Sequence, residues 1–176
     1  GDDTVTTSDL VSGTIYICEG AVVTNLSNSH WEPADSMKVN GTFAVKARSG
    51  WTDGKGAVLG ENGIINFIGS GVDDHAYNFS NITGSGKILF TNGTGYSMLP
   101  SDASRMPSTD VAVVNDNTES YVVLTCTGTT TIGTLSGSGK FDSRYGNATT
   151  RRLAVVQGAD SVWSGTFINE DRIGGL

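Results

Sequence analysis

The feature that most constrains this chain is a long succession of short β-rich runs, each separated from the next by Gly, Asn or Asp. Examples are 13–17, 42–46, 63–68, 87–90 and 152–156. About a dozen such runs follow one another at spacings of roughly 8–15 residues, which is typical of a sandwich, a barrel or a solenoid. No stretch of about 12 residues carries the apolar periodicity of an amphipathic helix without a Gly interrupting it. The sequence therefore predicts an all-β protein.

The composition supports this prediction. Gly, Thr, Ser and Asn fill 76 of the 176 positions. Thr is β-branched and suits strands, while Gly, Asn and Ser supply the backbone geometries of turns. A chain of this length buries a core without metals or staples, so we expect residues 1–176 to form a single all-β domain. We interpret it as a fragment of a larger extracellular protein.

An internal repeat favours a solenoid over a sandwich. The segment 82–88 reads Ile-Thr-Gly-Ser-Gly-Lys-Ile, and 135–141 reads Leu-Ser-Gly-Ser-Gly-Lys-Phe, 53 residues further on. In a solenoid, a Gly-Ser-Gly turn lets the backbone bend without Cβ clashes, and this spacing corresponds to about two coils of ~20–30 residues. Strand alternation then places the apolar residues of both copies inside and the two lysines outside. These residues are Ile82, Ile88, Leu135 and Phe141, with Lys87 and Lys140. A jelly-roll β-sandwich is the alternative fold.

The region Gly133–Asn169 contains Gly-Thr-Leu-Ser-Gly-Ser-Gly-Lys-Phe, then Leu-Ala-Val-Val-Gln-Gly, then Trp-Ser-Gly-Thr-Phe, and the segment Ile82–Phe90 matches the first half of this pattern. The pattern resembles an autotransporter-associated β-strand repeat. The resemblance implies a right-handed parallel β-helix in a secreted or surface-displayed protein, with Trp163 as a core aromatic residue. It brings no catalytic residues. The chain departs from the family in lacking tandem copies and in having long insertions at 26–36 and 96–108.

Two polar clusters are candidate metal sites. Asp73, Asp74 and His75 follow a Gly-rich stretch and could hold a divalent ion or share acid–base work. Asp116 and Glu119 lie in Asn-Asp-Asn-Thr-Glu, which offers oxygen ligands at alternate positions as calcium loops do. Both clusters also read as polar turns between strands, because Asp and Asn favour turns. The second lacks the rest of a calcium-binding pattern, so we expect no obligate metal and no other cofactor.

Two aromatic residues are candidate ligand contacts. Trp31 follows His30, and Trp51 lies in Ser-Gly-Trp-Thr-Asp-Gly, so both fall in loop-like surroundings. An exposed Trp can stack on the apolar face of a sugar. The alternative is that each packs its loop onto the body of the protein or covers an open end of the core.

The cysteines and the glycosylation sequons leave alternatives open. Cys18 and Cys126 are 108 positions apart and match no metal-binding spacing, so they are either separate thiols or a disulfide. A solenoid separates them by several coils and opposes the disulfide, whereas a sandwich allows it. Six Asn-x-Ser/Thr sequons occur, which a Ser/Thr-rich chain also produces by chance. They begin at Asn25, Asn40, Asn78, Asn81, Asn92 and Asn147.

Charge and hydropathy exclude several functions. The net charge is −7 and the basic residues form no cluster beyond Arg151 and Arg152, which argues against nucleic-acid binding. No apolar run approaches the ~20 residues that cross a bilayer, so we expect no membrane insertion by this segment. Gly84-Ser-Gly86 and Gly137-Ser-Gly139 are turns of the repeat and not nucleophile elbows.

The sequence predicts a non-enzymatic, structural or adhesive β-solenoid segment that is secreted or displayed at the cell surface. Host or environmental glycans, surface proteins, neighbouring coils and further copies of the chain are its candidate partners. A carbohydrate-binding β-sandwich that uses Trp31 or Trp51 is one alternative. A glycan-cleaving β-helix enzyme is another, since such enzymes assemble their carboxylates on one face of the solenoid and leave no local motif.

Overall fold

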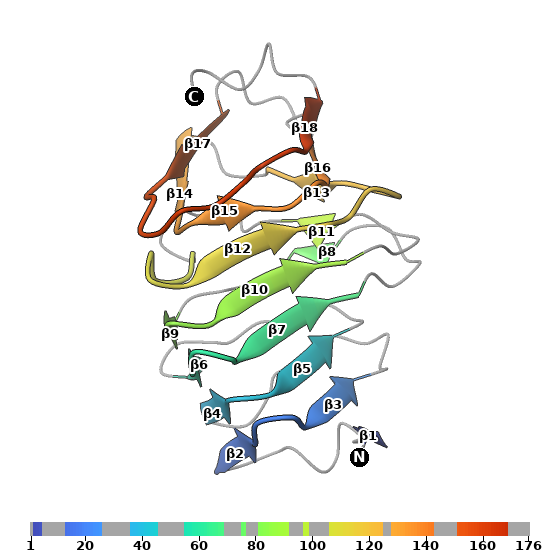
Figure 1. Ribbon diagram of the computed structural model, residues 1–176, viewed down its shortest axis with the longest axis vertical. Coiled ribbons are helices and arrows are strands. Elements are labelled where there is room, and N and C mark those ends of the chain that lie inside the picture. The colour runs from blue at the N-terminus through green and yellow to red at the C-terminus, as the bar shows by residue number, and fades with distance from the viewer. Residues whose placement is uncertain are drawn as a thin grey trace.

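A computed structural model describes ten stretches of the chain and shows a parallel β-solenoid (Figure 1). The described stretches are 2–4, 13–25, 36–45, 55–68, 75–76, 81–91, 97–98, 106–124, 128–142 and 151–168. Every pair of neighbouring strands in them is parallel, and they contain no helix. The all-β solenoid prediction is confirmed. The jelly-roll alternative is wrong, because a jelly roll is built from antiparallel strands.

The strands form three stacked sheets and one additional pair. The central sheet contains, in order, β1 (Asp2–Thr4), β3 (Val22–Asn25), β5 (Thr42–Val45), β7 (Ile64–Phe67), β10 (Lys87–Phe90), β12 (Ala112–Asn115) and β15 (Leu135–Ser136). The lateral sheet contains β2 (Thr14–Ile17), β4 (Ser36–Val39), β6 (Gly56–Leu59) and β9 (Ile82–Gly84). The third sheet contains β8 (His75–Ala76), β11 (Ser97–Met98), β13 (Val122–Val123), β16 (Lys140–Asp142) and β18 (Thr166–Ile168). The upper pair is β14 (Gly128–Ile132) with β17 (Arg151–Val155).

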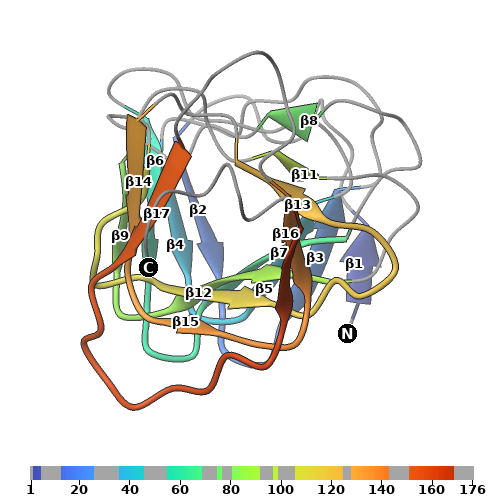
Figure 2. The same ribbon diagram turned by 90° about the horizontal axis from the view of Figure 1, so that it is seen from above.

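From β6 onward the described strands pass from the lateral side to the central sheet and then to the third sheet, as β6, β7 and β8 do. Viewed along the axis, the chain turns in the right-handed sense as it rises from β1 to β18, and the upper pair lies on the same side as the lateral sheet (Figure 2). The coils vary in length, since paired residues are as few as 19 positions apart, for Val122 and Phe141, and as many as 26, for Phe141 and Phe167. Right-handed turns are the general rule for parallel strand crossovers.

The core consists of inward-facing rows that run up the stack. One row of the central sheet is aliphatic and aromatic throughout, and all but its first residue are buried. It consists of Val23, Phe43, Ile65, Ile88, Val113 and Leu135. Because each residue lies about 4.8 Å above its equivalent in the previous coil, the rows fill the interior without gaps between coils.

A second inward row carries the phenylalanine stack. The rings of Phe67 and Phe90 lie 5.4 Å apart at an interplanar angle of 22°. The next residue up this row is Asn115, which pairs with Phe90 and is fully buried. The row therefore changes from aromatic to amide within one coil, and this change shapes the corner that follows β12.

The two copies of the internal repeat have the predicted orientation. Ile82, Ile88, Leu135 and Phe141 are buried, Lys87 is exposed, and Lys140 is half-buried.

Their positions differ by one corner of the solenoid. The first copy connects the lateral sheet to the central sheet, whereas the second connects the central sheet to the third sheet. The 53-residue spacing thus spans two coils and one further corner. The repeat marks a type of turn, and it does not mark equivalent positions in two coils.

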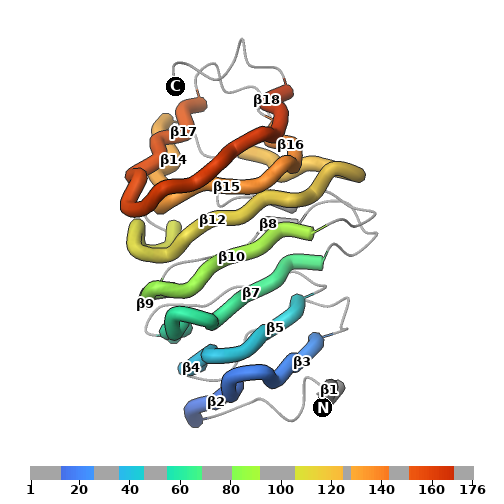
Figure 3. The backbone as a smooth tube through the Cα atoms, viewed as in Figure 1, coloured from blue at the N-terminus to red at the C-terminus, as the bar shows by residue number. Residues whose placement is uncertain are grey.

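The glycines of these turns are required by the coil beneath them. Gly84 and Gly137 have φ angles of 106° and 111°, which residues with a Cβ rarely adopt. A Cβ on Gly84 would overlap the carbonyl oxygen of Leu59, and one on Gly137 would overlap that of Asn115. Both contacts are with backbone of the preceding coil, which cannot move without breaking the sheet. The tube trace shows the strands of the central sheet lying one above another from β3 to β15 (Figure 3).

We expect Gly84→Ala to destabilise the protein by about 2–4 kcal/mol, because it combines an unfavourable φ with a backbone clash. Gly158→Ala is the matched control. Gly158 is exposed, and the nearest atom to its added Cβ is the Thr134 Oγ1 at 3.9 Å. Urea unfolding followed by circular dichroism measures both. Equal stability of the two variants would contradict the role of the corner glycines.

Candidate functional site

The candidate calcium loop at 115–119 is a structural corner in which the amides bind the backbone. Asn115 Nδ2 donates to the Lys140 carbonyl at 3.1 Å, and Asn115 Oδ1 accepts from the Asn117 N–H at 3.0 Å. Asn117 Oδ1 accepts from the Ser120 N–H at 2.9 Å. Both amides are buried, so their oxygens are directed to chain atoms.

The acidic residues of this corner are exposed and apart from the buried amides. Asp116 and Glu119 are exposed, and Asp116 Oδ1 accepts from the Ser138 N–H at 3.3 Å. Across the described stretches, no three His, Cys, Asp or Glu side chains come together as a metal site would require. The corner is better explained as a set of hydrogen bonds that hold two coils together than as a ligand set for calcium.

We expect a chelator to leave the melting temperature unchanged, because the Asn115 and Asn117 oxygens already accept backbone N–H groups. Asn115→Ala should instead destabilise the protein by about 1–3 kcal/mol with or without calcium, since it leaves buried backbone groups unpaired. Differential scanning fluorimetry with added calcium or chelator measures both. A rise of several degrees caused by calcium in the parent protein would contradict this interpretation.

Most of the other predicted site residues lie outside the described residues. These are Asp73, Asp74, Trp31 and Trp51. His75 begins β8, where its backbone pairs with that of Ser97. The predictions of a metal cluster at 73–75 and of sugar contacts at the two tryptophans therefore stay predictions.

Trp163 packs against the core, as the repeat resemblance implies. Its ring centroid lies 5.4 Å from that of Phe141 and 5.6 Å from that of Phe167, and its backbone bridges to Gly137. Phe141 and Phe167 are themselves stacked at 5.6 Å. The three rings fill the interior between β16 and β18, so Trp163 is a structural residue.

The most distinctive outward surface of the described stretches is a row on the lateral sheet, here called the tyrosine strip. It consists of Tyr16, Lys38, Val58 and Thr83, which are paired in register across β2, β4, β6 and β9. All four are exposed; the exposed fraction is 65% for Tyr16 and 50% for Val58. Lys38 Nζ lies 5.4 Å from the centroid of the Tyr16 ring, which is within the range of a cation–π contact.

Small polar residues border the strip. Thr14 and Ser36 are adjacent in register, and their hydroxyl oxygens are 2.8 Å apart. The next position up the same row is Gly56, which has no side chain. Asn81 covers this position, because a Cβ on Gly56 would overlap the Asn81 carbonyl oxygen and Cβ. The surface beside the strip therefore offers the hydroxyl groups of Thr14 and Ser36.

Sequence analysis did not single out the tyrosine strip. Tyr16 lies in the predicted run 13–17, and strict alternation within that run places its side chain outside. The sequence does not show that Tyr16 and Lys38 are neighbours, because that depends on which strand pairs with which and in what register. The 22-position offset between them is set by the length of the intervening segment, which includes β3.

The structure partly resolves the cysteine and sequon alternatives. Cys18 is exposed with a free thiol, and Cys126 lies outside the described residues. Asn25 is 3% exposed, so its sequon is inaccessible in the folded protein. Asn40 and Asn81 are exposed, and the Asn81 Nδ2 donates to the Lys55 carbonyl at 2.9 Å. The remaining sequons, at Asn78, Asn92 and Asn147, fall outside the described residues.

We expect two free thiols per chain in the denatured, unreduced protein, because Cys18 is free at the lowest lateral coil. Titration with a thiol reagent under non-reducing conditions measures the number, and a fully reduced sample gives the reference value. An intramolecular bond between Cys18 and Cys126 would require rearrangement of the stack and would contradict the structure.

Comparisons with known proteins do not assign the chain to a family. No family model matches the chain, and no curated protein or solved structure matches it either. Among the described residues, no helix is long and apolar enough to cross a membrane.

Proposed function

We propose that this chain is a non-enzymatic β-solenoid segment of a secreted or cell-surface protein, in which it acts as a structural or adhesive element. The observation that carries the proposal is the continuous stack of parallel strands with unbroken inward rows. Each coil is held to its neighbours by backbone hydrogen bonds in the central sheet and by the shared core. A stack of this kind extends in one direction and presents long faces to its surroundings.

The surface composition supports an adhesive role. Outward positions of the lateral sheet carry hydroxyl and lysine side chains, as at Thr14, Lys38 and Thr83. Side chains of adjacent coils are separated by the inter-strand spacing of about 4.8 Å, so the faces are regular arrays. A regular polar array on a rigid support suits repeated weak contacts with a partner.

The mechanical part of this function can be tested by pulling a single molecule from its two ends. Because each coil contacts only its neighbours, we expect extension in several steps, each releasing about one coil. One coil has 19 to 26 residues, as the Val122–Phe141 and Phe141–Phe167 pairs show. At roughly 3.5 Å per extended residue, each step should add about 6–9 nm. Release of the whole chain in one event would contradict the proposed structural role, in which each coil is held by its neighbours alone.

A second measurement tests the absence of catalysis. The purified protein should release no new reducing ends from a panel of neutral and acidic polysaccharides over prolonged incubation. Release that disappears in a heat-denatured sample would overturn the non-enzymatic assignment and favour the glycan-cleaving alternative.

A further inference from the structure

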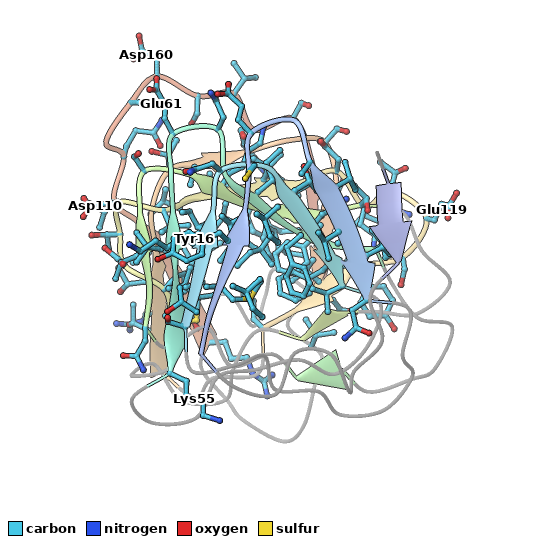
Figure 4. The ribbon with its side chains drawn as sticks, turned by 90° about the horizontal axis from the view of Figure 1, so that it is seen from below. Tyr16, Lys55, Glu61, Asp110, Glu119 and Asp160 are labelled. Atoms are coloured by element: carbon cyan, nitrogen blue, oxygen red, sulfur yellow. The ribbon has the colours of Figure 1, made fainter. Side chains whose placement is uncertain are left out.

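The charges of the described residues are unevenly distributed around the solenoid. Lys38 and Lys55 belong to the lateral side, as does Arg152, an exposed residue of β17 in the upper pair. Figure 4 shows Tyr16 and Lys55 on this side, while Glu119 projects from the opposite side. In this protein with a net charge of −7, Lys38 is the cation that contacts the exposed Tyr16 ring.

Carboxylates are concentrated at the edge of the lateral sheet and beyond it. Figure 4 shows Glu61 and Asp160 projecting at the corner beside the central sheet, with Asp110 on the lateral side. Asp110 lies between β11 and β12, above the strands that carry the tyrosine strip, and its Oδ2 accepts from Ser108 Oγ at 3.2 Å. Glu19 Oε1 accepts from Asn62 Nδ2 at 3.2 Å at the same corner as Glu61. The strip itself contains no carboxylate.

The chemistry of the strip fits an anionic polysaccharide. The Tyr16 ring can stack on the apolar face of a pyranose, and the Thr14 and Ser36 hydroxyls can bond sugar hydroxyls. The Lys38 ammonium, held above the Tyr16 ring, can pair with a carboxylate of the same ligand. An extended chain of sugars also matches the shape of the strip, which is one side chain wide and crosses four strands.

A protein partner fits the strip less well. Stable protein interfaces bury about 800 Å² on each partner and centre on a cluster of large apolar residues. Tyr16 and Val58 are the large exposed apolar residues of this sheet, and Lys38 separates them. The strip lacks the apolar centre that such an interface needs.

We propose that the tyrosine strip binds an anionic polysaccharide through Tyr16 and Lys38, with Lys55 adding to the local positive potential. The proposal deepens the adhesive function proposed above and rests on it. It assigns that function to the lateral face, and it identifies the partner by its acidic sugar units.

Binding of the whole chain to immobilised polygalacturonate, compared with the same polymer after full methyl esterification, tests the proposal. Esterification removes the charge and keeps the sugar backbone. We expect binding to polygalacturonate at least about tenfold tighter than to the ester, and weaker in high salt because mobile ions screen the contact. Lys38→Gln and Tyr16→Ala should each weaken binding about three- to tenfold.

Lys87→Gln is the matched control, because Lys87 is an exposed strand lysine on the central sheet. It removes the same charge from the protein and should leave the affinity within twofold. Circular dichroism and the melting temperature of each variant exclude loss of fold. Any of three results would overturn the proposal. They are equal affinity for polygalacturonate and its ester, an equal loss of affinity in Lys38→Gln and Lys87→Gln, and no binding to polygalacturonate at all. The last result would direct the search to a protein partner. The pulling experiment does not involve the strip, so it tests the structural function separately.

Discussion

The structure depends on the close approach of each coil to the one beneath it. Parallel strands must come within about 4.8 Å along their whole length, and this includes the corners where the chain turns. At the corners the closest atoms are backbone carbonyl oxygens, as Leu59 is to Gly84 and Asn115 is to Gly137. A side chain at those positions would separate the coils and break the sheets on both sides. The turn glycines therefore permit the stacking that buries the core rows.

Once the corners are closed, the remaining features follow from alternation. Inward positions become continuous rows such as Phe43, Ile65 and Ile88, and outward positions become surface arrays such as the tyrosine strip. The same register that aligns hydrophobic residues inside brings Tyr16 and Lys38 together outside. A single backbone arrangement thus produces both the stability of the rod and the candidate binding surface.

The sequence was informative wherever the relevant physics is local. Short β-branched runs, turn glycines and the alternation around Lys87 and Ile88 led to the correct class and to the correct inside and outside of the strands. The 53-residue repeat was less informative, because the same Gly-Ser-Gly turn occurs at two different corners of the solenoid. The Asn115–Glu119 segment was open to two interpretations, since oxygen-rich side chains serve calcium and backbone equally well. The tyrosine strip could not be predicted, because its members become neighbours only through long-range pairing.

The buried amide at Asn115 has a consequence for the accuracy of folding. In an all-apolar row, a coil that slides by two residues still points its hydrophobic side chains inward, so such errors cost little. Asn115 bonds to the Lys140 carbonyl and to the Asn117 N–H, and a slip would leave its amide buried without partners. The upper coils therefore have one admissible alignment. The Asn115 side chain there distinguishes the native neighbouring strand from other strands of nearly identical shape.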